Sequence, residues 1–443
     1  MTNSLVVVES PSKSKTLETY LGKSFKVLAS YGHVRDLLPK KGAVDPDNNF
    51  AMIYETIERN EKAVKSIKKA LKKADTLYLA TDPDREGEAI SWHLYELLKE
   101  KGCLENKEVH RVAFYEVTKS AVQDAIKNPR ELSSNLIDAQ HARRALDYLV
   151  GFNLSPLLWK KIQKGLSAGR VQSPALRMIV ERERDIEDFK AREYWTVESD
   201  LEFNDSDFLG RLTEFNNEKI KKFSIENAQQ ASTIKSTLED ASTSELLIKT
   251  VTKKQRKRQP TAPFITSTLQ QEAIRKLGFT AQWTMRVAQQ LYEGIDVGDG
   301  TIGLITYMRT DSVNLAKEAL TEIRSFISSR YGEKSLPEEP RVFKTKSKNA
   351  QEAHEAVRPT SVTRVPNEIK DSLTNEQFRL YELIWKRTMA SQMTHATIDS
   401  VAVDISCGEG NIFRANGSSI ADPGFMQVYL EGVDDTDNKE DDE

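Results

Sequence analysis

The sequence predicts a multidomain protein with α/β, all-α and β-rich parts. Short apolar strands alternate with helices over residues 1–127, which is the pattern of a parallel sheet covered by helices. A helical pattern follows over 128–192. Strand-like alternation fills 193–260 and 396–432, on either side of a second helical stretch over 261–395. Because the two strand-rich segments flank a helical insert, we expect them to form one β-rich domain that is split in the sequence.

Each element of the first region follows from its local pattern. Apolar β-branched runs predict strands and amphipathic runs predict helices. The expected strands are Leu5–Glu9, Phe25–Ser30, Thr76–Thr81 and His110–Tyr115, and the expected helices are Ser12–Tyr20, Asn60–Lys73, Glu86–Lys99 and Thr118–Lys127. A short insertion belonging to the helical domain is expected near 37–60.

The same patterns predict the remaining elements. Helices are expected over 133–188 with a break near Gly165–Gly169, and over Asn227–Leu238, Phe264–Tyr292, Ala316–Tyr331 and Asn375–Ser391. Strands are expected at Trp195–Phe203, Thr397–Ile405 and Phe425–Leu430. Residues 433–443 form an acidic loop or tail.

Composition excludes several classes of protein. The 443 residues are 38% apolar and 30% charged, so the chain can build cores beneath a solvated surface. No apolar run approaches the ~20 residues that a membrane helix needs, and Leu5–Val8 is too short for a signal-peptide core. The two cysteines, Cys103 and Cys407, exclude a disulfide framework and a four-cysteine zinc site. We therefore expect a cytoplasmic protein without zinc or a membrane partner.

The formal charge of −3 hides an uneven distribution. The last eleven residues carry seven acids and one lysine, a net charge of −6, so the other 432 residues sum to +3. Basic clusters lie at Lys160–Lys164 and Lys253–Arg258. A locally basic surface is compatible with nucleic acid, and a solvated lysine face explains the charge equally well.

An acidic cluster lies where two predicted strands end. Asp82, Asp84 and Glu86 follow the strand Thr76–Thr81, and Glu9 ends the first strand. If these strands are neighbours in a parallel sheet, the four carboxylates converge beyond its carboxyl edge. Carboxylates held together repel unless a cation compensates them, and Mg²⁺ is the hard ion that oxygen ligands suit.

The segment Asp82–Glu88 is also explained as the ordinary start of a helix. Asp82 or Asp84 can serve as the N-cap, and Glu86 and Glu88 then interact favourably with the helix dipole. Lys13 and Lys15 open the helix after Glu9, where a phosphate can be held.

No ATP site is expected. The segment Gly22-Lys23-Ser24 resembles the end of a phosphate-binding loop, but Leu17 stands where that motif requires glycine.

The arrangement of Glu9 with Asp82, Asp84 and Glu86 resembles the Toprim fold, which several Mg²⁺-dependent nucleic-acid enzymes share. The resemblance implies that these four residues bind Mg²⁺. It does not choose between a primase, a nuclease and a topoisomerase.

A second motif, Thr306-Tyr-Met-Arg-Thr-Asp-Ser312, narrows the choice. A tyrosine can attack a phosphodiester and hold the cut end covalently, and Arg309 can supply charge beside Tyr307. In isolation a tyrosine next to an arginine usually packs in a core. The segment closely resembles the active-site segment of type IA DNA topoisomerases, and the whole chain is most similar to their bacterial topoisomerase I branch.

Further segments resemble motifs of that family in the same order. They are Gln140–Asp147 running on to Phe152 and Trp159, Ser167–Ser173, His354–Thr360, and His33 within Ser30–Arg35. Each one alone reads equally well as a solvated helix face, a helix break or an ordinary histidine. The resemblance implies DNA-binding roles for His33, Arg143, Arg144, Asp147, Phe152, Trp159, Ser167, Ala168, Gly169, Arg170, Val171, Gln172 and Arg309.

The resemblance also implies a reaction. Tyr307 would become 5′-phosphotyrosyl, Glu9 would give a proton to the leaving 3′ oxygen, and Lys13, Arg309 and Arg170 would hold the phosphate. His354 would organise the phosphate or the nucleophile. The expected activity is ATP-independent relaxation of negatively supercoiled DNA by a monomer associated with the nucleoid. Strand passage would use a toroidal gate hinged at the split β-rich domain.

The chain is shorter than members of that family, so a C-terminally truncated fragment is expected. Two alternatives stay open. The first is a fragment that binds or cleaves single-stranded DNA without relaxing it. The second is another Toprim enzyme, a nuclease or a primase.

Overall fold

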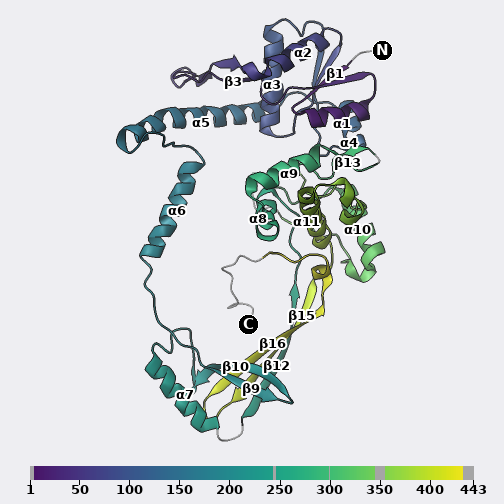
Figure 1. Ribbon diagram of the computed structural model, residues 1–443. Coiled ribbons are helices and arrows are strands. Elements are labelled where there is room, and N and C mark those ends of the chain that lie inside the picture. Colours follow the sequence, from purple (N-terminus) through teal and green to yellow (C-terminus); the bar gives the residue numbers. More distant parts are fainter. Residues whose placement is uncertain (1–3, 243–245, 299, 345–354, 433–443) are drawn as a thin grey trace. The chain divides into compact units, whose positions relative to one another are not determined.

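The computed structural model describes residues 4–242, 246–298, 300–344 and 355–432 (Figure 1). His354 and the acidic tail 433–443 lie outside the described residues. The chain divides into two compact units, which we treat separately. The first unit comprises Met1–Glu181, Ala262–Arg330 and Glu339–Met389, and the second comprises Arg182–Thr261, Tyr331–Glu338 and Ala390–Glu443. Among the described residues, no helix is both long and apolar enough to cross a membrane.

A four-stranded parallel sheet organises the start of the first unit. Its strand order is β2 (Phe25–Ala29), β1 (Ser4–Val8), β7 (Thr76–Leu79) and β8 (Glu108–Arg111). Every residue of β1 is buried, as expected for a strand covered on both faces. Because β1 and β7 are hydrogen-bonded neighbours, the predicted meeting of their carboxyl ends is confirmed.

Helices cover this sheet. α2 (Glu61–Leu71) and α3 (Arg85–Glu100) bury leucine, isoleucine and valine side chains against Leu5, Val7 and the corresponding side of β7. α1 (Pro11–Leu21) contacts β1 and β2 and packs against α4 (Lys119–Lys127). This α/β arrangement confirms the fold class that strand–helix alternation predicts.

A small β-rich insertion lies between β2 and α2. β3 (Arg35–Leu37) pairs with β6 (Tyr54–Thr56), and β4 (Val44–Asp45) pairs with β5 (Ala51–Met52), followed by the 3₁₀ turn η1 (Glu58–Asn60). This insertion packs on the long helix α5 (Ser134–Lys161) through a cluster that includes Val44, Ala145 and Tyr148. A loop that contains Gly165–Gly169 then leads to α6 (Gln172–Glu187), so the helix break falls where it was predicted.

The rest of the first unit carries the tyrosine segment. α8 (Thr266–Leu277) and α9 (Ala281–Glu293) are separated at Gly278, whose φ of +70° ends α8 in the left-handed conformation that glycine tolerates. A short hairpin of β13 (Ile295–Asp296) and β14 (Thr301–Ile302) precedes the segment. α10 (Lys317–Tyr331), α11 (Asn375–Ser391) and the 3₁₀ turns η2 (Glu333–Ser335), η3 (Pro366–Glu368) and η4 (Lys370–Ser372) follow it.

The second unit is built on a six-stranded sheet. Its order is β11 (Glu218–Lys219), β10 (Ser206–Phe215), β16 (Ile412–Asp422), β15 (Ala396–Ser406) and β12 (Leu247–Arg258), with β9 (Glu198–Phe203) paired to β10. α7 (Ala228–Ser242) packs on this sheet through Leu238. One sheet therefore joins strands from before residue 260 and after residue 395.

Two predicted strands need correction. The segment predicted as a strand over Phe425–Leu430 instead forms the 3₁₀ turn η5 (Gly424–Gln427), because Pro423 and Gly424 bend the chain and Val428 and Tyr429 donate backbone hydrogen bonds to Phe425. The strand that completes the sheet is β16, whose Asn-Gly-Ser-Ser centre conceals its extended conformation. β8 ends at Arg111, four residues before the predicted Tyr115.

Candidate active site

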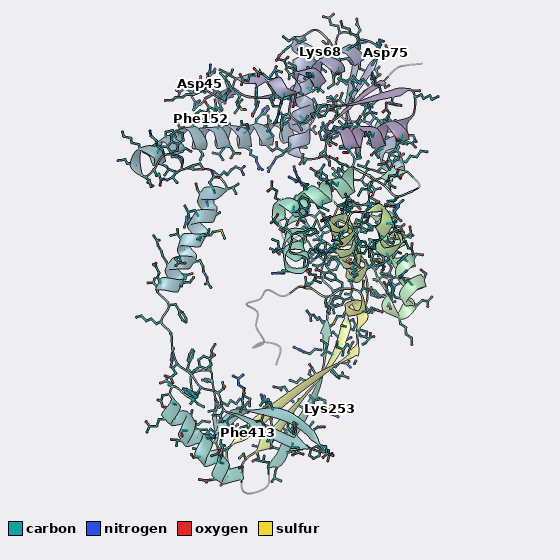
Figure 2. All side chains as sticks on the ribbon, viewed as in Figure 1. Asp45, Lys68, Asp75, Phe152, Lys253 and Phe413 are labelled. Atoms are coloured by element: carbon teal, nitrogen blue, oxygen red, sulfur yellow. The ribbon has the colours of Figure 1, made fainter. Side chains whose placement is uncertain are left out.

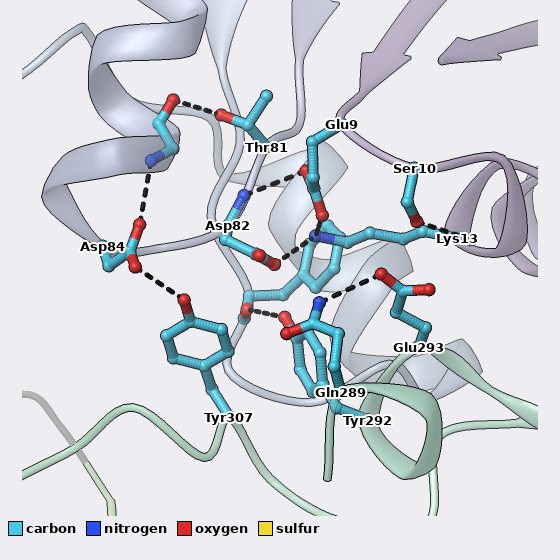
Figure 3. Close-up of polar contacts among 12 residues, drawn as sticks. Glu9, Ser10, Lys13, Thr81, Asp82, Asp84, Gln289, Tyr292, Glu293 and Tyr307 are labelled. Carbon is cyan, nitrogen blue, oxygen red and sulfur yellow. Dashed lines mark hydrogen bonds and ion pairs between the residues drawn. The ribbon is translucent and has the colours of Figure 1, made fainter. Parts of the chain in front are cut away.

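A buried lysine joins the ends of β1 and β7. The Lys13 Nζ atom lies 3.0 Å from Glu9 Oε1 and 2.9 Å from Asp82 Oδ1, and the Asp82 backbone N–H donates to Glu9 Oε2 at 3.1 Å (Figure 3). The Lys13 side chain is completely buried, above the rings of Phe114 and Tyr292. The cation that compensates this carboxylate pair is therefore supplied by the chain itself.

Burial and charge set the protonation of this cluster. Burial raises the pKa of Glu9 to about 8, because the attraction of Lys13 does not fully offset desolvation and repulsion from Asp82. Burial also opposes the charged form of Asp82, but Lys13 outweighs it and lowers the pKa of that carboxyl. For Lys13 the desolvation is outweighed by the two carboxylates, which raise its pKa and keep it charged. Glu9 is the member of the cluster that exchanges a proton near neutral pH.

Asp84 has two roles in the structure. Its Oδ1 caps α3 by accepting from the Gly87 backbone N–H at 2.8 Å, and its Oδ2 accepts from the Tyr307 hydroxyl at 2.7 Å. Gly87 is required at this helix start because a Cβ there would lie 2.1 Å from the Asp82 carbonyl oxygen. The helix-cap interpretation of Asp84 is therefore confirmed, and the same carboxylate also faces Tyr307.

Tyr307 is buried and protonated. Burial, followed by the charges of Asp82 and Asp84, raises the pKa of its phenol far above the ordinary value. Arg309, whose Nη1 lies 3.3 Å from Asp84 Oδ2, lowers the pKa of Tyr307, but by less than burial and the two aspartates raise it. We expected Arg309 to ease formation of the phenolate. In the structure the acidic surroundings outweigh Arg309 and keep the pKa of Tyr307 raised.

Glu86 belongs to the same acidic loop and faces His33 and Gln140. Its Oε2 is 3.4 Å from His33 Nε2 and 3.5 Å from Gln140 Nε2. The hydrogen bond with His33 is the main cause of the lowered pKa of Glu86. His33 is thereby placed at the edge of the acidic loop, and its DNA-binding role stays a prediction.

The four predicted metal ligands line one cavity of about 600 Å³ together with Arg309 and residues of α9. Their carboxylate oxygens are the donor type that Mg²⁺ takes. Among the described residues, however, no group of three or more histidine, cysteine, aspartate or glutamate side chains is arranged to hold a metal. Lys13 already engages Glu9 and Asp82, so Asp82, Asp84 and Glu86 would have to reorient to share an ion. The magnesium site remains a prediction.

A second cavity, of about 900 Å³, lies along α5. Its lining includes Arg144, Asp147, Phe152 and Trp159 from α5, opposite the insertion residues Asp36–Pro39 and Glu55–Arg59. We call this cavity the α5 groove. Phe152 is 43% exposed and stacks on Tyr148 with ring centroids 4.4 Å apart, which leaves part of an aromatic surface open to a ligand.

Charged residues of the α5 groove are partly paired. Arg144 Nη2 lies 2.9 Å from Asp36 Oδ1, and Arg170 binds Asp147 through Nε at 2.9 Å and Nη2 at 3.1 Å. Arg143 acts electrostatically on Glu86 and Asp147. Arg170 thus contacts the groove through Asp147, and its predicted contact with the reacting phosphate stays a prediction.

The loop after α5 is held close to that helix. The Trp159 indole N–H donates to the Leu166 carbonyl at 2.6 Å, and the Ala168 N–H donates to Ser155 Oγ at 3.2 Å. Ser167 and Gly169 form local hydrogen bonds with Gln172 and Ser173, respectively, and Val171 is exposed. The predicted DNA-contacting loop is thus at the end of α5. His354 lies outside the described residues.

Sequence reasoning missed a buried support beneath the acidic loop. Arg111 donates to the carbonyl oxygens of Thr81 at 2.9 Å and Asp82 at 2.7 Å, and its Nε binds Glu88 Oε2 at 2.9 Å. Glu88 also accepts from Arg130 at 2.7 Å. The motif singles out Glu88 only as a helix-dipole residue, and nothing in the sequence marks Arg111 as its partner.

Tyr292 and Gln289 of α9 were also missed. The Tyr292 ring meets that of Tyr307 edge-on with centroids 5.1 Å apart, and its hydroxyl donates to the Phe114 carbonyl at 3.2 Å. Gln289 donates to Glu293 at 3.0 Å (Figure 3). Helical spacing predicts only that these residues share a face of α9.

The fold and this site define a Toprim-type protein with a tyrosine held against the acidic loop. Residues 4–117 match the Toprim domain, and residues 131–443 match the family described as DNA topoisomerase. The second match covers more than half of the chain, which therefore belongs to the DNA topoisomerase family.

The individual relatives that the chain matches carry names from the same family. DNA topoisomerase 1 of Xylella fastidiosa strain Temecula1 is 57% identical over 444 residues, covering 100% of this chain and 54% of the relative. The Rickettsia bellii enzyme of the same name is 54% identical over 434 residues, covering 97% of this chain and 54% of the relative. The full-length topoisomerase I structure from Thermotoga maritima matches with a TM-score of 0.80 and 36% identity, over 97% of this chain and 70% of that one. The chain spans about half the length of the curated relatives it matches.

Proposed function

We propose that this chain carries the cleavage and rejoining centre of an ATP-independent type IA DNA topoisomerase. The observation that supports this most directly is the position of the Tyr307 hydroxyl, 2.7 Å from Asp84 Oδ2. Asp84 belongs to the same acidic loop as Asp82, which is bound by Lys13 beside Glu9. A nucleophile, a proton carrier and a fixed cation are thus within one site.

The proposed step exchanges one phosphoester for another. The Tyr307 oxygen forms a bond to phosphorus, and its proton passes first to Asp84, the acceptor it already contacts. The bond from phosphorus to the 3′ oxygen breaks, and protonated Glu9 delivers its proton to that oxygen. Rejoining reverses each transfer. Because the number of phosphoester bonds is unchanged, no nucleotide hydrolysis is needed.

Charge explains why the free site keeps Tyr307 protonated. Lys13 and Arg309 are the cations that lie beside the reacting atoms, and a phosphate entering the cavity would draw them from the carboxylates. When bound, Mg²⁺ on Asp82, Asp84 and Glu86 would offset the negative charge that raises the pKa of Tyr307.

The α5 groove supplies a place for the substrate strand. Stacking of a base on the exposed part of Phe152, with arginines following the backbone, is the usual way in which unpaired nucleic acid is bound. We therefore propose single-stranded or underwound DNA as the substrate of the whole protein, and relaxation of negative supercoils as its outcome.

Covalent trapping tests the nucleophile. The chain is incubated with a 3′-labelled single-stranded oligonucleotide, because the fragment that stays on a 5′-phosphotyrosine carries the 3′ end, and the mixture is denatured and separated by gel electrophoresis. Tyr307→Phe should abolish the covalent adduct and retain oligonucleotide binding. The matched variant Tyr381→Phe removes a buried hydroxyl outside the site, which donates to the Arg364 carbonyl, and should retain the adduct.

The alternatives predict different products. A Toprim nuclease would release free cut ends, and a primase would incorporate nucleotides, in both cases without dependence on Tyr307. An adduct that survives Tyr307→Phe would falsify the assignment. A fragment without relaxation activity would form the adduct and leave plasmid supercoiling unchanged.

A further inference from the structure

The second unit carries a row of cations that the proposed reaction does not use. β12 contains Lys253-Lys254-Gln255-Arg256-Lys257-Arg258, and every residue of this strand is exposed (Lys253 is labelled in Figure 2). β12 is the last strand on its side of the sheet, since the order ends with β15 and β12. Among the described residues, none of these five basic side chains forms an ion pair or a side-chain hydrogen bond.

The pairing register explains why the charges stay uncompensated. β15 has two acids. Asp399 lies opposite Gln255, the neutral residue of the row, and accepts a hydrogen bond from it at 2.9 Å. Asp404 lies opposite Thr250 and is bound by Arg414 at 2.6 Å. The acids of the neighbouring strand are therefore aligned with residues other than the five cations.

The two faces of β12 differ. Side chains alternate along a strand, so Lys253 and Lys257 share the face of Gln255, diagonally across from Asp399. Lys254, Arg256 and Arg258 occupy the other face, opposite Ser400, Ile398 and Ala396. The next strand continues this face with uncharged residues, because Ile420 pairs with Ile398 and Ser418 with Ser400. We call Lys254, Arg256 and Arg258 the cation face.

We propose that the cation face binds the phosphate backbone of a DNA segment, at a site distinct from the α5 groove. Residues two apart on a strand are about 6.7 Å apart, so the three cations are evenly spaced along β12. A straight row of cations suits a linear polyanion, and neighbouring serine hydroxyls can add hydrogen bonds to phosphate oxygens. The proposed contacts are to phosphate oxygens, which carry no sequence information, so we expect binding to be independent of sequence.

Charged residues on an edge strand also prevent edge-to-edge aggregation. That role needs charge on the edge, but it does not need charge of a single sign, whereas Lys253–Arg258 holds five cations and no acid, and the register places no acid opposite any of them. A row of one sign favours a polyanionic ligand over edge protection alone.

The experiment measures binding of a labelled 30-base-pair duplex by fluorescence anisotropy over a series of salt concentrations. The test variant combines Lys254→Gln, Arg256→Gln and Arg258→Gln. The matched control removes three exposed lysines of the first unit, by Lys62→Gln, Lys69→Gln and Lys73→Gln. A second variant, Arg256→Lys with Arg258→Lys, keeps the charge and shows whether the strand tolerates substitution.

Loss of three phosphate contacts should reduce the magnitude of the slope of log K against log salt by about 2.7, and should weaken binding roughly 500-fold at 0.1 M salt relative to 1 M salt. The control and the charge-preserving variant should keep the slope of the unmodified chain. Trapping of a short oligonucleotide by Tyr307 should also persist in the test variant, so failure of the proposed reaction and failure of this proposal are read separately.

Two outcomes would overturn the proposal. An unchanged slope in the test variant would mean that the cations only solvate or protect the edge. An unchanged slope combined with lost binding to phosphatidylserine vesicles would assign the surface to a membrane instead.

Discussion

Positive charge is buried and paired with carboxylates in the active site, whereas among the described residues it is exposed and unpaired on the cation face of β12. Lys13 is fully buried and held by Glu9 and Asp82 at 3.0 and 2.9 Å, whereas Lys254 is exposed and lies opposite a serine. A buried charge without a partner costs several kcal/mol, so the sequence must supply carboxylates beside it. An exposed charge costs little and is left available for a ligand. We infer that a buried, paired charge such as Lys13 maintains the fold, and that an exposed charge such as Lys254, unpaired within the described part of the chain, is available to a ligand.

Removing the buried cation should have the largest effect. Lys13→Met leaves Glu9 and Asp82 buried without their cation, and we expect a loss of about 3 kcal/mol in the free energy of unfolding. The adduct with Tyr307 should also be lost. Urea denaturation at pH 8 measures the first effect. Lys15→Met, an exposed lysine on the same helix, should change stability by less than about 0.5 kcal/mol. Equal stability of the two variants would show that the buried pair needs no cation.

The pH dependence tests the same cluster by a smaller perturbation. Glu9 has a folded-state pKa of about 8, above the ordinary value of 4.5, so the folded protein binds its proton more tightly than the unfolded chain. Its contribution to stability is complete below about pH 4.5 and is lost as the pH rises toward 8, a change on the order of a few kcal/mol. Glu9→Gln should flatten this decline. Denaturation of both proteins at a series of pH values measures the difference.

The same proton should control the rate of cleavage. In the proposed step protonated Glu9 gives its proton to the 3′ oxygen, so the initial rate of adduct formation should fall as the pH rises through about 8. An initial rate that is independent of pH between 6 and 9 would assign the proton transfer to another group.

The sequence predicts some parts of this molecule better than others, for physical reasons. Strand ends and loops such as Glu9 and Asp82–Glu86 are local features, and a parallel sheet brings its carboxyl ends together whatever the details of packing. The turn at Gly424–Gln427 and the strand Ile412–Asp422 were missed because apolar content there does not follow backbone conformation.

Pairings between distant residues were also missed. Arg111 with Glu88, and Tyr292 with Tyr307, depend on how separate elements pack, and no spacing within one element reveals them. The raised pKa of Tyr307 follows from the same cause, since it sums burial and charges contributed by a loop more than 200 residues earlier in the chain.

The cations of the α5 groove are more paired than those of the cation face and less paired than Lys13. Substitutions in this groove should have the smallest effect. Its arginines are partly paired, as Arg144 is with Asp36, so much of its affinity should come from the open ring surface of Phe152. Phe152→Ala should weaken binding of a short single-stranded oligonucleotide by about 1–3 kcal/mol, measured by anisotropy. Because stacking carries no charge, the salt dependence should stay unchanged, in contrast to substitutions on the cation face. Phe203→Ala, which removes an exposed ring in the second unit, is the control and should leave affinity unaltered. A change in salt slope without a change in affinity at high salt would mean that the groove binds through charge alone.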